Sequence, residues 1–259
     1  MLPNLYIPPL TIFGPVKIRP FGVLVVLAIL TGWWLSVRRA KVSGLDAEIM
    51  ENGVWWSVFA GFVTGHLVSE IFYFPERVVQ NPLELLMIWR SLSSFGGFFG
   101  GILGALIYFR RKGVAALTYM EAMVFGLVPA WIFGRLGCTI VFDHPGVATD
   151  FFLGMADRTG VIRHNLGFYE LLLAVGLTVV LYGLKNVSPF EGFHSAVIIF
   201  LYAPVRFLLD TLRAEDRSYY GFTPGQYFAV VLALLGAALV VGGVRAKARK
   251  ASGDSRAGK

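Results

Sequence analysis

The chain has 259 residues, of which 56% are hydrophobic and only 15% are charged, and its mean hydropathy is +0.66. A soluble domain carries about a quarter charged residues, and here the apolar residues come in blocks near bilayer-crossing length. The net charge of +7 is spread over short loops and the C-terminal tail, so it indicates membrane topology and excludes a nucleic-acid-binding face. Cys138 is the single cysteine, which excludes an intramolecular disulfide.

Seven apolar segments are predicted to be membrane-spanning helices. The stretch VVQNPLELLMIW, between the second and third segments, is too short and amphipathic to cross a bilayer, so it is expected at the surface. The sequence therefore predicts an all-α polytopic membrane protein with one transmembrane domain over residues 1–243. The predicted spans are Pro20–Val37, Val54–Phe74, Leu92–Phe109, Ala115–Phe142, Leu166–Leu184, Phe190–Leu209 and Pro224–Val241.

The distribution of basic residues predicts the orientation. Thirteen Lys and Arg residues lie on the side of the C-terminal tail and eight on the other side, and six of the seven lysines are on the tail side. Because cytoplasmic loops carry the excess of basic residues, we expect a cytoplasmic C-terminus and an outside N-terminus. The connection at about 143–165 is then periplasmic, and residues 244–259 are expected to be a basic, disordered cytoplasmic tail.

Several ionisable residues fall inside the predicted spans, where a charge costs roughly 2.5–3.5 kcal/mol. Two pairs have the i, i+4 spacing of a helical ion pair, His66 with Glu70 and Arg206 with Asp210. Each pair has two interpretations, a buried pair that holds helices together or part of a functional site. The other ionisable residues of the spans include Glu121, Arg135 and Glu170.

The sixth span favours the functional interpretation. Tyr202, Arg206 and Arg213 are spaced by four and seven residues, so one stripe of this helix presents a phenol and two guanidiniums. Arginine binds phosphate through paired, charge-assisted hydrogen bonds. With Arg135 from the fourth span, this stripe would suit a phospholipid headgroup.

The segment SSFGGFFGGILG contains four glycines within six residues, beginning with Gly96 and Gly97. Glycines at such spacing allow two helices to pack closely. They could instead let a lipid approach the backbone N–H groups, and the sequence leaves both interpretations open.

Six segments together resemble the prolipoprotein diacylglyceryl transferase family over nearly the whole chain. GPVKIRPFG resembles the family's GP-x-x-IR-x-YG opening, and NPLELLMIW precedes SSFGGFFGG as a similar stretch precedes the family's SFHGG segment. GRLGCTIVFDHPG is similar to the family signature GR-[IL]-G-[NC]-F. RHNLGFYE is similar to HP-x-QLYE, YAPVRFLLDTLR to Y-x-x-x-RF-x-x-E-x-x-R, and FTPGQ follows in the family's order.

The resemblance implies roles for individual residues. Arg135 matches the signature arginine that binds the lipid phosphate, and Phe95 and Phe21 stand where the family usually has histidine and tyrosine. Cys138 stands at the usual asparagine, a familiar variant to which we assign no catalytic role. The other matching positions are Glu121, Tyr169, Glu170, Tyr202, Arg206 and Arg213, while Asp210 replaces a glutamate.

The implied activity transfers the diacylglyceryl group of phosphatidylglycerol to the lipobox cysteine of a preprolipoprotein, in the bacterial plasma (inner) membrane. We expect Arg135, Arg206, His144 and Asp143 to be catalytic, with His144 as the general base and Asp143 or Glu70 behind it. The alternative interpretation of His144 is an ordinary histidine in a surface loop. The expected substrate-binding residues are Tyr202, Arg213, Glu121, Gly96 and Gly97.

No cofactor or metal is expected, and the partners are phosphatidylglycerol, lipobox signal peptides and the lipid bilayer. Two other functions remain open. A divergent, non-catalytic phospholipid-binding protein would fit Phe95, the replaced histidine. A small-molecule transporter would be indicated by inverted repeats with broken helices, and the sequence shows none.

Overall fold

The computed structural model describes residues 2–3, 5–13, 16–88, 91–214 and 218–257. The chain forms two compact units. The first unit holds residues 1–32 and 124–259, and the second unit holds residues 33–123. The helices α1 (Pro20–Val42) and α5 (Ala116–Val141) each contribute residues to both units, and the single transmembrane domain stays a prediction.

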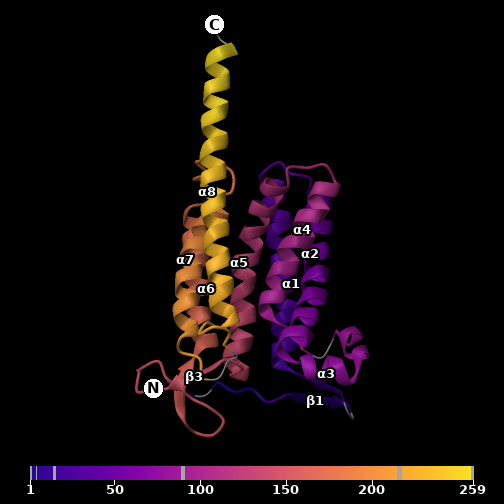
Figure 1. The fold of residues 1–259 in the computed structure, drawn as a ribbon, viewed down its shortest axis with the longest axis vertical. Helices are drawn as coiled ribbons and strands as arrows, with labels where there is room; N and C mark the ends of the chain where they lie inside the picture. The colour runs from indigo at the N-terminus through magenta and orange to yellow at the C-terminus, as the bar shows by residue number, and fades with distance from the viewer. Residues whose placement is uncertain (1, 4, 14–15, 89–90, 215–217, 258–259) are drawn as a thin grey trace. The chain divides into compact units, whose positions relative to one another are not determined.

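Helices dominate the structure, as the sequence predicts (Figure 1). Each predicted span is helical along most of its length, although the second helix begins seven residues earlier than predicted and the last helix continues sixteen residues farther. The stretch from Ser69 to Leu86 forms three short helical turns. The long helices are α1 (Pro20–Val42), α2 (Ala47–Val68), α4 (Ser94–Arg111), α5 (Ala116–Val141), α6 (Leu166–Gly183), α7 (Phe193–Asp210) and α8 (Pro224–Ala257). The short ones are the π-helical turn η1 (Ser69–Tyr73), α3 (Pro75–Gln80) and the 3₁₀ turn η2 (Pro82–Leu86).

Among the described residues, five helices are long and apolar enough to cross a membrane: α1, α5, α6, α7 and α8. The chain is therefore a multi-pass membrane protein of the all-α class. Helices α2 and α4 occupy the second and third predicted spans. Acidic residues at the start of α2, and the glycines and terminal arginines of α4, make these two helices more polar. The total of seven spans and the orientation stay predictions.

In the second unit, α2 and α4 pack closely through the predicted glycine segment. A Cβ added to Gly96 would lie 2.7 Å from the Thr64 carbonyl oxygen, and one added to Gly100 would lie 2.7 Å from the Ala60 carbonyl oxygen. Neither position has room for a side chain, so the helices approach backbone to backbone. The packing interpretation of Gly96 and Gly100 is confirmed.

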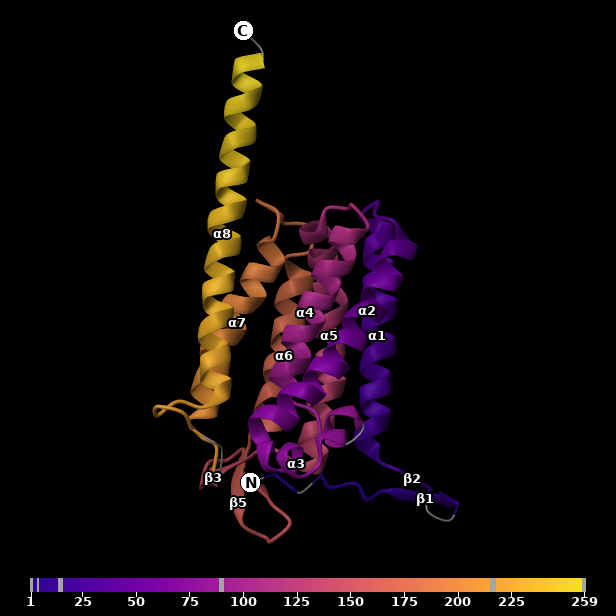
Figure 2. The same cartoon turned by 45° about the vertical axis from the view of Figure 1, so that its right-hand side comes forward.

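In the first unit, the C-terminal half of α5 packs with α6, α7 and α8 around an apolar core. Helices α7 and α8 lie side by side in both views (Figures 1 and 2). The close packing of the core side chains fixes which faces the four helices turn toward one another. The core consists of Phe125, Val128, Leu177, Leu181, Ile198, Tyr202, Ala203 and Leu232.

Short strands occur in two places outside the helices. An N-terminal hairpin pairs β1 (Leu10–Phe13) with β2 (Val16–Ile18). The long connection at 143–165 contains an antiparallel sheet of β3 (Pro145–Ala148), β5 (Ile162–Asn165) and β4 (Met155–Ala156), in that order. Strands of two to four residues are too short to show an alternating pattern.

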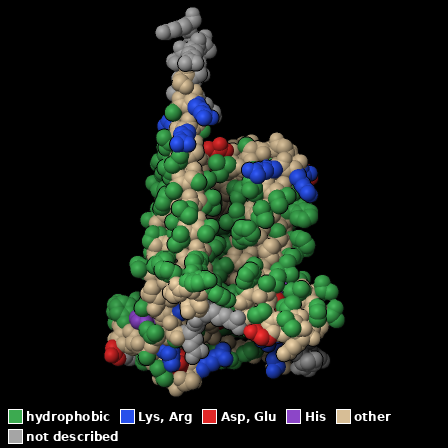
Figure 3. Space-filling view, in the orientation of Figure 1, with side chains coloured by type: hydrophobic (Ala, Val, Ile, Leu, Met, Phe, Trp, Pro, Cys, Tyr) green, Lys and Arg blue, Asp and Glu red, His purple; other side chains and the backbone are tan. Residues whose placement is uncertain are grey.

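Helix α8 continues to Ala257, whereas the sequence analysis expects disorder after residue 243. Green apolar side chains follow α8 up to blue Lys and Arg side chains near its upper end (Figure 3). The run RAKARK consists only of strong helix formers, so the helix has no local reason to stop where the apolar segment ends. The expected disorder of residues 244–259 stays a prediction beside this helical assignment.

Candidate functional site

The first turn of α6 lies directly against the last turns of α5. A Cβ added to Gly167 would lie 2.9 Å from the Thr139 backbone nitrogen, so only glycine permits this approach. Asn165 caps α6 by accepting a hydrogen bond from the Phe168 N–H at 3.1 Å, and its amide donates to the Thr139 carbonyl at 3.1 Å. Asn165 is fully buried. These contacts fix the start of α6 against Thr139, which lies one helical turn after Arg135 on α5.

Glu170, one turn into α6, contacts two arginines from different helices. Its Oε2 lies 2.7 Å from Nη2 of Arg135 on α5, and its Oε1 lies 3.7 Å from Nη1 of Arg206 on α7. All three side chains are at most 7% exposed. The arginines that the sequence analysis placed at one headgroup are thus brought together, with a carboxylate between them.

Asp210 continues this network toward α8. Its Oδ1 lies 2.6 Å from Nη1 of Arg206 and 3.1 Å from Nε of Arg213, so the predicted i, i+4 pair of Arg206 and Asp210 is confirmed. Thr223, just before α8, donates a hydrogen bond from its hydroxyl to Oδ2 of Asp210. A Cβ added to Gly225 would lie 2.8 Å from Nη2 of Arg206. The network therefore fits against the first turn of α8 only because residue 225 is glycine.

The segment after α5 is held by backbone hydrogen bonds on both sides. The His144 carbonyl accepts from the Leu166 N–H at 3.2 Å, and the Leu212 carbonyl accepts from the Val147 N–H at 2.8 Å. These bonds join the segment to the start of α6 and the end of α7, where Arg213 lies. The segment thereby carries Asp143 and His144 to the site.

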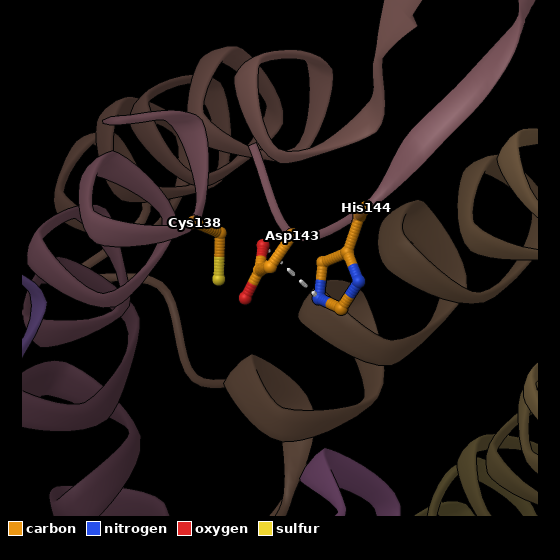
Figure 4. Close-up of side chains that lie close together, drawn as sticks. All are labelled: Cys138, Asp143 and His144. Atoms are coloured by element: carbon orange, nitrogen blue, oxygen red, sulfur yellow. Dashed lines mark ion pairs between the residues drawn. The ribbon is translucent and has the colours of Figure 1, made fainter. Parts of the chain in front are cut away.

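Asp143 and His144 lie beside Cys138 on the last turn of α5 (Figure 4). The three side chains place a thiol sulfur, a carboxylate oxygen and an imidazole nitrogen within 4.8 Å of one another. The Cys138 thiol lies beside the Asp143 carboxylate, and Nε2 of His144 lies 3.8 Å from Oδ1 of Asp143. Figure 4 shows the carboxylate between the sulfur and the ring.

The surroundings of Asp143 and His144 shift their pKa values in opposite directions. Burial raises the pKa of the Asp143 carboxyl to about 6, against the charge of Arg135, which acts to lower it. Burial and the charge of Arg213 lower the pKa of the His144 imidazole to about 3. The Asp143 side chain is still 38% exposed, so water screens part of its interactions. At neutral pH the imidazole is neutral and only weakly basic, whereas the carboxylate can take up a proton.

Sulfur, oxygen and nitrogen atoms at this spacing can also ligate a metal ion, and no other group of described residues gathers three such ligand atoms. The positive charges of Arg213, Arg135 and Arg206 all act on the His144 ring. A divalent cation would be repelled by them. We therefore assign no metal to this cluster.

The family profile described as "Prolipoprotein diacylglyceryl transferase" matches residues 8–242. The chain belongs to this family. A phosphatidylglycerol–prolipoprotein diacylglyceryl transferase of Chromohalobacter salexigens is 30% identical over 241 residues, 88% of this chain and 89% of that protein. The protein of the same name from Nitratidesulfovibrio vulgaris (strain DP4) is 28% identical over 86% of this chain and 89% of its own length. The one from Thermus thermophilus is 38% identical over 48% of this chain and 44% of its own length.

Membership of the diacylglyceryl transferase family confirms the resemblance. The remaining predicted site residues lie in both units of the structure. The Tyr202 ring lies 4.6 Å from the Trp131 ring, and the Arg135 guanidinium lies 5.4 Å from the same Trp131 ring. Tyr202 therefore belongs to the arginine site of the first unit. Gly96, Gly97 and Glu121 belong to the second unit, and their role in substrate binding stays a prediction.

The predicted His66–Glu70 pair is replaced by other partners in the second unit. The His66 ring nitrogens lie 3.1 Å from the Ser91 carbonyl oxygen and 2.9 Å from the Glu84 carbonyl oxygen. Glu70, which lies in the π-helical turn η1, accepts a hydrogen bond from the Ser91 hydroxyl. Both side chains hold the connection before α4 onto the end of α2. The i, i+4 spacing was a poor guide here because the regular α-helix ends before Glu70.

Some residues that shape this site were not selected from the sequence as site residues. Glu170 and Asp210 were matched to family positions, but their contacts with two arginines each follow only from the packing of three helices. Asn165 gave a local signal, because Asn before an apolar run is typical of a helix N-cap, whereas the close approach at Gly167 gave none.

Proposed function

We propose that this chain transfers the diacylglyceryl group of phosphatidylglycerol to the lipobox cysteine of exported preprolipoproteins, in the bacterial plasma membrane. In the reaction, a carbon–sulfur bond forms to the glyceryl carbon, the bond from that carbon to the phosphate oxygen breaks, and glycerol phosphate leaves. The observation that carries the proposal is the pair Arg135 and Arg206, held on the two oxygens of Glu170 in a chain of the diacylglyceryl transferase family.

The arginine network supports binding of an anionic headgroup. Arg135, Arg206 and Arg213 contribute three positive charges, whereas Glu170 and Asp210 contribute two negative charges. Within the described part of the chain, the buried Nε of Arg135 has no hydrogen-bond partner, and a buried N–H donor is unfavourable until an acceptor reaches it. A phosphate oxygen is the acceptor that the reaction supplies.

The same charges would stabilise the leaving group. As the carbon–oxygen bond breaks, negative charge grows on the phosphate of the departing glycerol phosphate. Guanidiniums held in place before the reaction stabilise that charge without reorganising, and the loss of one such donor costs about 10²–10³-fold in rate. Arg135 and Arg206 are nearly excluded from solvent, where their charges are little screened.

Asp143 is the best general base in the site. The substrate thiol has an ordinary pKa of about 8.5 and must become a thiolate to attack. Burial brings the pKa of Asp143 to about 6, closer to neutral pH than the value of about 3 for His144. The proton passes to a carboxylate oxygen of Asp143, and the sulfur attacks the glyceryl carbon. This changes the order expected from the sequence, since Asp143 now takes the proton and the neutral His144 ring lies beside it, with Nε2 3.8 Å from Oδ1 of Asp143.

The proposal is tested in a bacterium depleted of its own diacylglyceryl transferase. Expression of this chain should restore lipid attachment to a reporter lipoprotein, seen as incorporation of a labelled fatty acid, and Asp143→Asn should not. If the wild-type chain is inserted in the membrane, binds phosphatidylglycerol and attaches no lipid, a non-catalytic phospholipid-binding role replaces the transferase. The non-catalytic role is the alternative to test, because Phe95 stands at the position of the family histidine.

A further inference from the structure

Phe142, directly before Asp143, has a left-handed backbone with φ of 55°. This region is small for residues that carry a Cβ, and a bulky residue there is an outlier. Such strain is maintained only where the surrounding structure holds the backbone, and it is concentrated at functional sites. Phe142 lies in the turn that joins α5 to the segment of Asp143 and His144.

The left-handed turn has a definite geometrical effect. The Phe142 N–H donates to the Cys138 carbonyl at 3.0 Å, which closes the end of α5 in a manner that usually employs glycine. The chain then reverses, so that the Asp143 carboxylate comes back beside the Cys138 side chain (Figure 4). On the far side, the His144 carbonyl is held by the Leu166 N–H. The turn at Phe142 therefore sets the direction of Asp143.

We propose that Phe142 is a positioning residue for Asp143, and that the restriction of its backbone, more than any contact of its ring, keeps the carboxylate in place. Glycine would remove the strain but would make many more backbone conformations accessible. A residue with a Cβ has a narrow left-handed region and, once held there, little freedom to turn. The inference rests on the proposed role of Asp143 as the general base.

Two variants that both lack the ring separate backbone restriction from ring contacts. Phe142→Asn removes the ring and tolerates the left-handed region, because asparagine is the residue after glycine that adopts it most readily. Phe142→Gly removes the ring equally and adds freedom. If the ring matters, the Asn and Gly variants should be equally impaired; if restriction matters, only Phe142→Gly should be.

The chain offers a matched control at Tyr220, the other described residue with a side chain and positive φ. Tyr220 is fully exposed and precedes Gly221, also at positive φ, in a turn closed by hydrogen bonds between Tyr219 and Phe222. Tyr220→Gly adds the same backbone freedom in the loop before α8.

The experiment measures kcat, KM and the thermal midpoint of the purified full-length wild type, Phe142→Gly, Phe142→Asn, Tyr220→Gly and Asp143→Asn, with phosphatidylglycerol vesicles and a lipobox peptide. We expect Phe142→Gly to lower kcat by about 10–100-fold with little change in KM. The kcat of Phe142→Asn should stay within about threefold of the wild-type value, and the kcat of Tyr220→Gly should equal the wild-type value.

Equal kcat values for Phe142→Gly and Phe142→Asn, or a wild-type kcat for Phe142→Gly, would overturn the positioning role. Should Phe142→Gly not fold, Phe142→Ala takes its place beside Phe142→Asn: both lack the ring and keep a Cβ, so a large loss of kcat in both would also overturn it. An unimpaired Asp143→Asn variant would instead refute the proposed base, which distinguishes the failure of that premise from the failure of this inference.

Discussion

Arg135 and Glu170 form a buried ion pair, with Nη2 and Oε2 only 2.7 Å apart and side chains 7% and 2% exposed. Each residue lies on a different helix, so the pair joins α5 to α6 and also places two charged groups in the site. A buried pair of this kind contributes little net stability compared with apolar packing, yet removal of one partner leaves the other charge uncompensated.

Glu170→Gln should therefore destabilise the protein strongly. Loss of the carboxylate leaves Arg135 and Arg206 facing each other without their shared counter-charge, and breaking a buried pair costs about 3–5 kcal/mol. The free energy of unfolding in detergent, measured with denaturant, checks this. Glu48→Gln, in the exposed first turn of α2, is the control and should cost less than about 1 kcal/mol. Equal effects of the two substitutions would contradict the bridging role of Glu170.

Gly225→Ala should impair activity by a steric route. The added methyl group would meet Arg206 and Asp210, and neither side chain can retreat because both are buried. We expect a loss of at least about tenfold in kcat/KM, as misplacement of a catalytic group by about 1 Å can cost far more. Gly242→Ala, on the same helix with nothing within 4 Å of the added atom, should leave kcat/KM unchanged. A wild-type kcat/KM for Gly225→Ala would show that activity does not depend on the close contact of the Arg206–Asp210 pair with α8.

Much of the architecture follows from the sequence, because apolar blocks bounded by charges or prolines set the ends of helices such as α5 and α6. The i, i+4 rule found the Arg206–Asp210 pair, which lies within one regular helix. It failed for His66 and Glu70, where the helix changes to a π-helical turn. The bridge through Glu170 depends on three helices meeting, and no spacing along one chain segment encodes that meeting.

The order of Asp143 and His144 in the mechanism was also beyond the sequence. From the ordinary pKa values, the histidine is the natural base at neutral pH. Burial and three nearby guanidiniums reverse this order by lowering the pKa of His144 and leaving Asp143 with a raised one. Only the three-dimensional arrangement reveals those neighbours.

The pH dependence of transfer should report Asp143. A base with a pKa of about 6 must lose its proton to act, so kcat/KM should rise with pH through about 6 and then level off. Arg135, Arg213, Cys138 and His144 are the charged and titratable groups that act on or contact this carboxylate. Asp143→Asn should lose about 10²–10⁴-fold and show no such rise. A rise that persists in Asp143→Asn and disappears in His144→Ala would return the base to His144.

The same shift predicts how folding stability depends on pH. Because the pKa of Asp143 is raised above its ordinary value of 3.8, the folded state binds its proton more tightly than the unfolded state. Its contribution to stability is thus present below pH 3.8 and lost as the pH rises through about 6. The thermal midpoint of Asp143→Asn relative to the wild type should therefore increase between these two pH values. A constant difference would contradict the raised pKa.

The orientation can be checked with reporters. The excess of basic residues on the side of the tail predicts that a fusion after Lys259 is cytoplasmic and that an insertion near Asp150 is periplasmic. Paired alkaline phosphatase and fluorescent-protein fusions at each position give the side directly. Both reporters on one side would rule out an odd number of spans between the two positions.

We propose that Arg135 and Arg206 together bind the phosphate of the lipid that is consumed. The most direct test is the rate at which purified protein forms the thioether between a lipobox peptide and the diacylglyceryl group of phosphatidylglycerol, measured by mass spectrometry. Lysine keeps the charge but not the planar, paired donors. Arg135→Lys and Arg206→Lys should each lower kcat/KM by at least about tenfold, while Arg245→Lys, on the exposed tail of α8, should not change it. Full activity in both buried variants would contradict the phosphate site.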